Sequence, residues 1–521
     1  MKNKKILIIG GGIAGLSAGS YLQRNGYNTE IFEAHNLPGG VCTAWKRGEY
    51  TFDYCIHWLM GTNESSGFHT IWEELGALED EEGKKTQIQN FEKFTSVELK
   101  NGEVVPLYAD LNKLEQEFLK LAPEDEKNIR KFIKDLKKLA DFKEGVVNDQ
   151  GSIIDKISFW FKNTIPFLKL IKYVRMSMEE LSEKWENPQL KEIFSCVIPS
   201  SWSALSLLLG LAKQHVQAAG YPIGGSLPFV RNIERKYLKL GGEINYSSKV
   251  EKILVKNDQA IGIRLENGEE YYGDEIISAA DGHTTLFKML EGEYLSSKLE
   301  KAYEEFSLFP SSIHLGFGVN KDLSELPHSM LLNFSDPLIL PDGSEHEYIN
   351  LMVYHFDPTL APEGKTPVTV LLNTWKDEYW QELAEEVPER YKKEKKRIGE
   401  DVLNILEERF PGFSEAVEQI DISTPHTVKR YTNNWHGSYE GFAPTPEALM
   451  TKLPKEIPGL DNCYMIGQWT EPGGGIPSAA LNGRNITRKL CKKDNKEFFS
   501  NSLVPKFDLP RRSQRTPRED V

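Results

Sequence analysis

The clearest hydrophobic pattern lies at the start of the chain, where Lys5 is followed by four branched apolar residues, Ile6 to Ile9. Such a run predicts a strand that is buried on both faces, as in a parallel sheet. A glycine-rich turn comes next, and then a helical stretch over 16–25 that Gly26 closes. Residues 28–32 predict a second strand. The chain therefore opens with a strand, turn, helix and strand, which indicates an α/β fold.

Periodicity divides the rest of the chain into elements of both kinds. Alternation of apolar and polar residues predicts strands, and apolar residues three and four apart predict helices. In chain order we expect a strand over 50–58, a hairpin over 94–108 turning on Asn101-Gly102, helical periodicity over 111–142, a helix over 226–240, strands over 243–246, 250–256, 260–265 and 271–279, strands and loops over 307–374, a charged helix over 391–409, and a strand, glycine loop and helix over 462–491.

The turn after the first strand carries chemistry. Residues 10–15 read Gly-Gly-Gly-Ile-Ala-Gly and satisfy the G-x-G-x-x-G pattern of dinucleotide sites. In that pattern Gly10 makes the tight turn, Gly12 lets the backbone approach a pyrophosphate, and Gly15 lets helix and strand pack closely. The helix start offers free N–H groups to the pyrophosphate. Glu33 ends the second strand, where a carboxylate binds a ribose hydroxyl. Together these features predict a bound dinucleotide.

One basic stretch departs from the rest of the chain. Residues 156–175 contain five basic residues and no acidic ones, interleaved with aromatic and aliphatic residues. Two interpretations remain open. The stretch is a peripheral membrane-docking surface, or it is a cap over an apolar pocket with its lysines in solvent.

Composition narrows the class of protein. The 521 residues allow several domains, and the net charge of −14 argues against nucleic acid as a partner. Five cysteines without a C-x-x-C pair favour a reducing cytoplasm and give no metal-site spacing. The first strand begins within five residues, so we expect no signal peptide. The most apolar stretch, 202–212, is too short to span a bilayer. A cytoplasmic protein, with or without membrane association, is expected.

Three separated segments together resemble the phytoene desaturase, carotenoid isomerase and retinol saturase group of FAD oxidoreductases. The first segment is the opening unit with Gly39-Gly40, and the second runs over 250–281. The third, 464–477, matches the desaturase signature, although Gln468 and Trp469 stand where small residues are expected. Phe52-Asp53-x-x-Ile56-His57 and the turn over 221–225 are most similar to the retinol saturase branch.

The resemblance implies an α/β protein with a Rossmann-type, glutathione-reductase-like FAD-binding domain and an inserted α+β substrate domain. It also implies noncovalent FAD, an apolar tunnel for a polyene or isoprenoid lipid, hydride exchange at flavin N5, and an external electron donor or acceptor. The expected domain boundaries are 1–110, 216–292 and 456–495 for the FAD-binding segments, 111–215 for a helical substrate or membrane-facing segment, 293–455 for the substrate-domain sheet, and 496–521 for a disordered tail.

The resemblance also assigns candidate residues. His57 is the candidate catalytic residue, as an acid or a substrate-orienting group, with structural packing as the alternative. Residues expected to line the substrate pocket are His215, Tyr221, Trp435 and Tyr439. Residues expected to bind FAD are Gly10, Gly12, Ile13, Ala14, Gly15, Glu33, Ala34, Gly39, Gly40, Val41, Val250, Asp281, Gly467, Gly474, Gly475 and Ile476. No metal site is expected.

Two other functions share this cofactor fold and stay open at this point. One is a flavin amine oxidase or a protoporphyrinogen-oxidase-like enzyme. The other is a prenyl-lipid carrier of the GDP-dissociation-inhibitor type, which performs no flavin chemistry. The intact glycines of the opening unit and of residues 473–475, together with Glu33, argue against the carrier.

Overall fold

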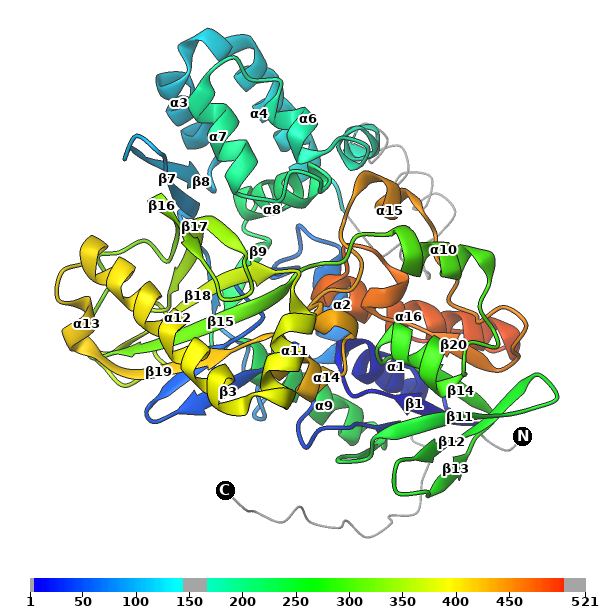
Figure 1. Ribbon diagram of the computed structural model, residues 1–521. Coiled ribbons are helices and arrows are strands. Elements are labelled where there is room, and N and C mark those ends of the chain that lie inside the picture. Colours follow the sequence, from blue (N-terminus) through cyan, green and yellow to red (C-terminus); the bar gives the residue numbers. More distant parts are fainter. Residues whose placement is uncertain (1–3, 144–165, 501–521) are drawn as a thin grey trace.

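The fold is built around a five-stranded parallel sheet in the order β10-β2-β1-β14-β20. A computed structural model describes residues 4–143 and 166–500 (Figure 1). Strands from three distant parts of the chain form this sheet. Its strands are β1 (Lys5–Ile9), β2 (Asn28–Phe32), β10 (Glu243–Asn245), β14 (Glu275–Ser278) and β20 (Cys463–Met465).

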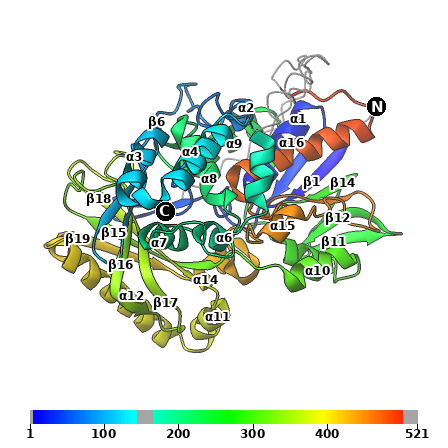
Figure 2. The same cartoon turned by 90° about the horizontal axis from the view of Figure 1, so that it is seen from above.

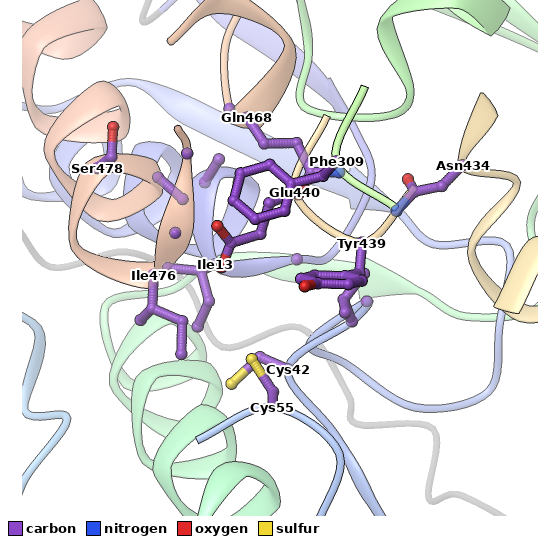
Figure 3. Close-up of a pocket in the computed structure, with 18 of the residues that line it drawn as sticks. Ile13, Cys42, Cys55, Phe309, Asn434, Tyr439, Glu440, Gln468, Ile476 and Ser478 are labelled. Carbon is purple, nitrogen blue, oxygen red and sulfur yellow. The ribbon is translucent and has the colours of Figure 1, made fainter. Parts of the chain in front are cut away.

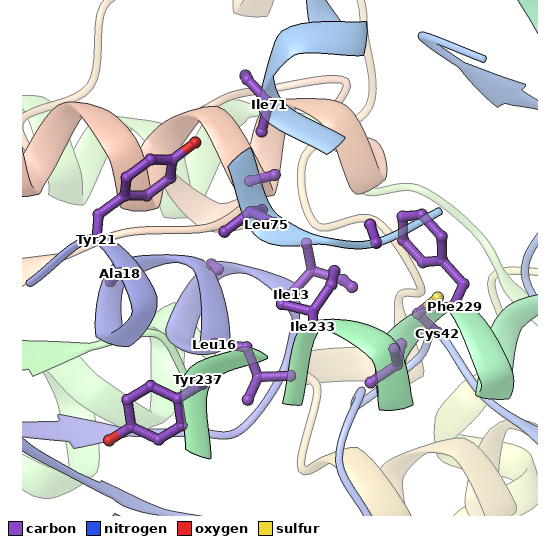
Figure 4. Close-up of a cluster of buried hydrophobic side chains, with 14 of the residues drawn as sticks. Ile13, Leu16, Ala18, Tyr21, Cys42, Ile71, Leu75, Phe229, Ile233 and Tyr237 are labelled. Atoms are coloured by element: carbon purple, nitrogen blue, oxygen red, sulfur yellow. The ribbon is translucent and has the colours of Figure 1, made fainter. Parts of the chain in front are cut away.

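Both faces of this sheet are covered, which confirms the prediction for the first strand. Ile6 and Ile8 of β1 join one buried cluster with helices, whereas Leu7 and Ile9 join another. Figure 4 shows the first cluster, in which side chains of the helix after β1 meet those of two further helices. These helices are α1 (Ile13–Arg24), α2 (Phe68–Leu75) and α9 (Ser226–Lys239). The other face packs on a three-stranded sheet of β11 (Val250–Lys256), β12 (Gln259–Leu265) and β13 (Glu270–Tyr272).

The last helix of the described chain, α16 (Gly475–Lys493), packs directly on α1. Ser17 Oγ of α1 donates a hydrogen bond to the Ala480 carbonyl at 2.7 Å. A Cβ on Gly483 would lie 2.4 Å from the Ala18 nitrogen, so the two backbones approach as closely as they do because residue 483 is glycine. The N-terminal and C-terminal parts of the cofactor domain are thereby held together.

A seven-stranded sheet in the order β19-β15-β18-β17-β16-β7-β8 forms the second lobe. It is antiparallel except where β16 meets β7. Its strands are β7 (Lys93–Glu98), β8 (Val104–Tyr108), β15 (Ser311–Val319), β16 (Ser329–Ile339), β17 (Glu345–Val353), β18 (Thr366–Thr374) and β19 (Val417–Ser423). Helices α11 (Asp377–Glu386), α12 (Pro388–Arg409) and α13 (Phe413–Ala416) cover one side of it.

A helical group stands above both sheets in Figure 1 and has its own apolar core. Seen from above in Figure 2, these helices lie over the region between the two lobes. They are α3 (Leu111–Leu121), α4 (Glu126–Ala140), α6 (Met178–Ser182), α7 (Pro188–Cys196) and α8 (Leu205–His215). The remaining elements are β3 (Ala44–Arg47), β4 (Tyr50–Asp53), β5 (Leu59–Met60), β6 (Ile88–Gln89), β9 (Ala219–Pro222), α10 (Ser297–Glu305), α14 (Pro425–Thr432), α15 (Pro446–Met450), a π-helix (Thr284–Met289), and single 3₁₀ turns at Pro123–Asp125, Trp435–Gly437 and Gln468–Thr470.

Four local predictions differ from the structure. The helical stretch over 111–142 is two helices, because a 3₁₀ turn begins at Pro123. The strand expected over 271–279 is two strands, β13 and β14. The chain stops pairing with β12 before Asp274, whose N–H donates to the Lys5 carbonyl of β1. The strand expected over 50–58 ends at Asp53, whose carboxylate accepts the two N–H groups of the following turn. The hairpin over 94–108 forms as expected but joins the substrate-domain sheet, not the cofactor domain.

The basic stretch over 156–175 is described only from residue 166 onward, where the chain is helical to residue 174. Lys169 and Lys172 both form ion pairs with Asp135 of α4, at 2.7 and 2.9 Å. These two lysines therefore anchor the stretch to the helical group. No helix in the described ranges is both long and apolar enough to cross a membrane. Of the expected tail over 496–521, residues up to 500 are described, and Phe498 packs beside Tyr21 of α1. The rest of the tail lies outside the described residues.

Candidate active site

A cavity of about 790 Å³ lies where the cofactor domain, the seven-stranded sheet and the helical group meet. Every residue predicted to bind FAD lines this cavity except Gly15, which lies one turn into α1. Three segments that are far apart in sequence thus contribute to one surface. Its volume falls within the range of about 300–1,000 Å³ that is typical of ligand and cofactor sites.

The glycine turn after β1 forms a cradle with room for a ligand. Gly10 has φ +97°, which makes the tight turn. A Cβ on Gly12 would meet nothing closer than the Gly39 carbonyl at 3.8 Å, so this position opens into the cavity. A Cβ on Gly15, in contrast, would lie 2.0 Å from the Gly10 carbonyl oxygen. This geometry is compatible with the roles predicted for the three glycines. The free N–H groups at the start of α1 face a space that suits a pyrophosphate.

Glu33 is held in place at the end of β2. Its carboxylate accepts hydrogen bonds from the backbone N–H of Gly11 at 2.6 Å and of His35 at 2.8 Å. Burial raises the pKa of this carboxyl, and these backbone hydrogen bonds act in the opposite direction. The side chain lines the cavity beside the glycine cradle, where the carboxylate of a dinucleotide site binds a ribose hydroxyl.

The C-terminal glycine loop brings a second helix start into the same cavity. Gly467 has φ +100°, and a Cβ there would contact the Ala14 side chain at 3.5 Å. Gly474 and Gly475 line the cavity at the first turn of α16. The positive end of this helix favours negative charge nearby, which suits the pyrimidine side of a flavin. The cradle, Glu33 and the two helix starts together fit a flavin dinucleotide.

The opposite half of the cavity is apolar. Trp202 and Phe309 pack edge to face with their ring centroids 4.4 Å apart, and Phe309 also meets the Tyr439 ring at 5.3 Å. The sheet contributes the polar side chains Ser312, Asn350 and Asn373 together with Leu371, and the helical group contributes apolar residues of α8. The apolar residues that line this half are Trp58, Phe142, Leu170, Val197, Ile198, Pro199, Trp202, Leu205, Leu209, Phe309 and Leu371. Leu170 belongs to the basic stretch, as the pocket-cap interpretation expects.

Three groups that could move a proton or orient a ligand lie where the two halves meet. Burial lowers the pKa of His57 to about 4, so this histidine is neutral at pH 7 and is not a cationic acid there. Tyr439 points into the cavity beside Glu440, as Figure 3 shows. Burial raises the pKa of Glu440 to about 7. In the described parts of the chain, no residue donates a hydrogen bond to the Glu440 carboxyl, which leaves it available to a ligand.

Comparison with known proteins shows which family the chain belongs to. A family model described as flavin containing amine oxidoreductase matches residues 13–491. The chain belongs to this family. Membership implies a flavin cofactor, in agreement with the cradle, and a fold of the flavin amine oxidase type with a parallel cofactor sheet and a mixed substrate-domain sheet. The resemblance to FAD oxidoreductases stated from sequence is confirmed at this level.

Curated relatives of this flavin oxidoreductase are carotenoid enzymes. The chain is 26% identical to the chloroplastic prolycopene isomerase of Daucus carota over 493 residues, covering 92% of this chain and 78% of the relative. It is 26% identical to the 4,4'-diaponeurosporene oxygenase of Staphylococcus haemolyticus over 518 residues, covering 94% and 97%. Among solved structures, an oxidoreductase from Methanosarcina mazei matches with a TM-score of 0.59 at 19% identity, covering 93% of this chain and all of the other. This last likeness concerns the fold.

Three of the four residues predicted to line the substrate pocket lie outside the wall of the flavoprotein's cavity. His215 accepts the Leu111 N–H at 3.2 Å and so caps the start of α3. Tyr221 is fully buried, with its ring 5.0 Å from that of Phe356. Trp435 stacks on His283 and donates its backbone N–H to Asp281 at 2.9 Å. The structure thus gives each of these side chains a packing or capping role and does not bring it into the cavity wall. Tyr439 alone of the four lines the cavity.

Glu440 was missed as a site residue, although its neighbour Tyr439 was predicted to line the pocket. No spacing in the sequence marks it, since it lies in an irregular loop between α14 and α15. An acidic residue between Tyr439 and Gly441 was the available signal.

No cluster of three or more His, Cys, Asp or Glu side chains suited to a metal occurs within residues 4–143 and 166–500.

Substituting Glu440 with glutamine is expected to change how stability depends on pH. Because burial raises the pKa of Glu440 from 4.5 to about 7, the native state keeps a proton that the unfolded chain releases in this interval. Protonated Glu440 therefore stabilises the parent protein fully below about pH 4.5, and this stabilisation is lost as the pH rises to about 7. The unfolding free energy of Glu440→Gln minus that of the parent should increase over this window and level off above it.

Urea unfolding at a series of pH values measures this difference. Glu447→Gln is the matched control, because its side chain is 67% exposed. The control should follow the parent at every pH. Parallel stability curves for Glu440→Gln and the parent would show that the Glu440 carboxyl is not perturbed by burial.

Proposed function

We propose that this protein is an FAD-dependent oxidoreductase that acts on carbon–carbon double bonds of an apolar polyene or isoprenoid lipid. The observation that carries the proposal is the single cavity, in which the dinucleotide cradle continues into a half lined by aromatic and aliphatic side chains. A long apolar substrate bound there would place one of its double bonds beside the flavin. The names of the curated relatives, an isomerase of prolycopene and an oxygenase of diaponeurosporene, support the substrate class.

The residues of the chain perform distinct tasks in this proposal. The first glycine turn and Glu33 hold the adenosine diphosphate part of FAD, and the start of α16 faces the flavin ring. When bound, the flavin supplies hydride exchange with a carbon–carbon unit of the substrate. The aromatic side chains Trp202 and Phe309 hold the polyene and exclude water. Glu440 holds or accepts a proton near the reacting atoms.

Saturation, desaturation and isomerisation of the substrate all fit this arrangement. A second G-x-G-x-x-G pattern does not occur in the sequence, so electrons are exchanged with an external donor or acceptor in the first two cases. Isomerisation needs reduced flavin but no net electron transfer. The three reactions are distinguished by the state of the flavin before and after the substrate changes.

An anaerobic spectrum of the FAD-loaded protein tests the proposal. The flavin is reduced with dithionite and mixed with a panel of polyenes, and the visible absorbance of flavin and polyene is followed. Reoxidation of the flavin with loss of a conjugated double bond indicates a saturase, and a change of polyene geometry with the flavin still reduced indicates an isomerase. Bleaching of oxidised flavin by a lipid indicates a desaturase.

Two results of the same experiment would contradict the proposal. If FAD binds but no polyene exchanges electrons or changes geometry, while an amine reduces the flavin, the protein is an amine oxidase. If the purified protein stays colourless with added FAD but binds prenyl lipids, it is a carrier.

A further inference from the structure

Cys42 and Cys55 stand at matching positions on either side of the β3–β4 hairpin. Ala44 pairs with Asp53 in the hairpin register, and the Tyr54 N–H donates to the Thr43 carbonyl at 3.1 Å. Continuing this register by one more pair places residue 42 opposite residue 55. Facing residues of an antiparallel pair have Cα atoms about 4.5–5.5 Å apart, within the range of about 4.4–6.8 Å that a disulfide spans. Figure 3 shows the two sulfur atoms side by side.

This cysteine pair belongs to the wall of the cofactor cavity. Both residues line it, and Cys42 follows directly on the Gly39-Gly40 turn, with its N–H donating to the Gly39 carbonyl at 3.1 Å. Figure 3 places the pair across from Ile476, at the start of α16 where the flavin ring is expected. The other three cysteines of the chain, Cys196, Cys463 and Cys491, do not line the cavity.

The surroundings of the pair include a group that can take a proton. A hydrogen bond with Cys42 and burial raise the pKa of the Cys55 thiol well above its ordinary value, and the nearby Glu440 carboxylate adds to this. The Cys55 thiol therefore needs a base before it can react. The buried carboxyl of Glu440, which lines the same cavity and acts electrostatically on Cys55, is such a base.

We propose that Cys42 and Cys55 form a redox-active dithiol–disulfide pair that exchanges two electrons with the bound flavin. This inference rests on the flavin of the proposed function. In the forward direction both S–H bonds break, one S–S bond forms, and the two electrons reduce the oxidised flavin. One proton accompanies the electrons to the flavin, and Glu440 accepts the other. An external dithiol then restores the pair by thiol–disulfide exchange. The pair thus gives the protein a route to reduced flavin that needs no nicotinamide site.

Thiol mapping of the FAD-loaded protein tests the pair directly. The protein is reduced with a dithiol, desalted without oxygen, loaded with oxidised FAD, and followed by its visible absorbance. It is then unfolded, alkylated and digested for mass spectrometry. We expect the flavin to bleach without any substrate, and a peptide in which Cys42 and Cys55 are linked to replace the two alkylated peptides. Cys196, Cys463 and Cys491 should remain alkylated and serve as internal references.

Single substitutions provide the matched controls. Cys42→Ser and Cys55→Ser should each bind FAD but lose the bleaching, whereas Cys491→Ser should bleach at the rate of the parent. If a serine variant fails to fold, the proposal is tested by the peptide map of the parent protein, which shows whether Cys42 and Cys55 become linked. If the bound FAD stays oxidised and both cysteines are recovered in alkylated form, Cys42 and Cys55 are not a redox pair. That result would not contradict the proposed function. A protein that binds no FAD would overturn both.

Discussion

Replacing Gly12 with valine is expected to abolish FAD retention while leaving the chain folded. The backbone at Gly12, with φ −72° and ψ −178°, is one that valine adopts readily, and the space around its Cβ position is open. The added methyl groups would fill the cradle where the pyrophosphate approaches the backbone. Overpacking such a contact costs about 3 kcal/mol, which lowers the affinity for FAD by about 100-fold or more. Flavin absorbance that elutes with the protein, and titration with FAD, measure the loss.

A neighbouring glycine supplies the control for this substitution. Gly15→Ala should lower the unfolding free energy, because the new Cβ would lie 2.0 Å from the Gly10 carbonyl oxygen. Gly12→Val should instead unfold at nearly the same urea concentration as the FAD-free parent. Stoichiometric FAD in purified Gly12→Val would show that the cofactor does not pass this turn.

The second large effect is expected in the other half of the cavity. Leu209 lies on α8, is half-buried and lines the apolar half. Tryptophan at this position would fill space that the lipid needs, so Leu209→Trp should weaken polyene binding by about 100-fold while FAD binding is unchanged. Co-elution of a coloured polyene with the FAD-loaded protein reports the first quantity, and flavin absorbance reports the second.

An exposed leucine on another helix is the matched control. Leu238 of α9 is 46% exposed, so Leu238→Trp adds the same ring away from the cavity and should bind polyene as the parent does. Undiminished polyene binding by Leu209→Trp would place the substrate outside the apolar half. Loss of FAD together with the polyene would instead indicate general damage to the fold.

Local geometry made the cofactor half predictable from sequence. The turn at Gly10 and the close approach of Gly15 to the Gly10 carbonyl are set within a few residues of the chain, so the motif alone predicts them. The position of Glu33 follows from the length of the helix between two parallel strands. Three segments were predicted to share the cofactor domain, and strands from all three lie in the parallel sheet.

The substrate half was less predictable, because its residues come from irregular loops and from the packing of separate domains. His215, Tyr221 and Trp435 are close in sequence to residues that line the cavity. Their side chains do not line it and instead contact Leu111, Phe356 and His283. No periodicity determines the direction of a side chain in a loop or at a helix end. Glu440 was overlooked for the same reason, since a single acidic residue in a loop resembles many solvated ones until its burial is known. The sheet that the β7–β8 hairpin joins also could not be predicted locally, because it depends on a long-range pairing of β7 with β16.

The position of α16 near the end of the described residues has a consequence for biosynthesis. Proteins emerge from the ribosome with the N-terminus first, so α1 and its glycine turn are made more than four hundred residues before the helix that packs on them. Until then the small-residue face of α1 has no permanent neighbour, and the wall of the cavity contributed by residues 473–475 does not exist. FAD capture therefore follows the synthesis and docking of α16, because only then are both walls of the cofactor site present.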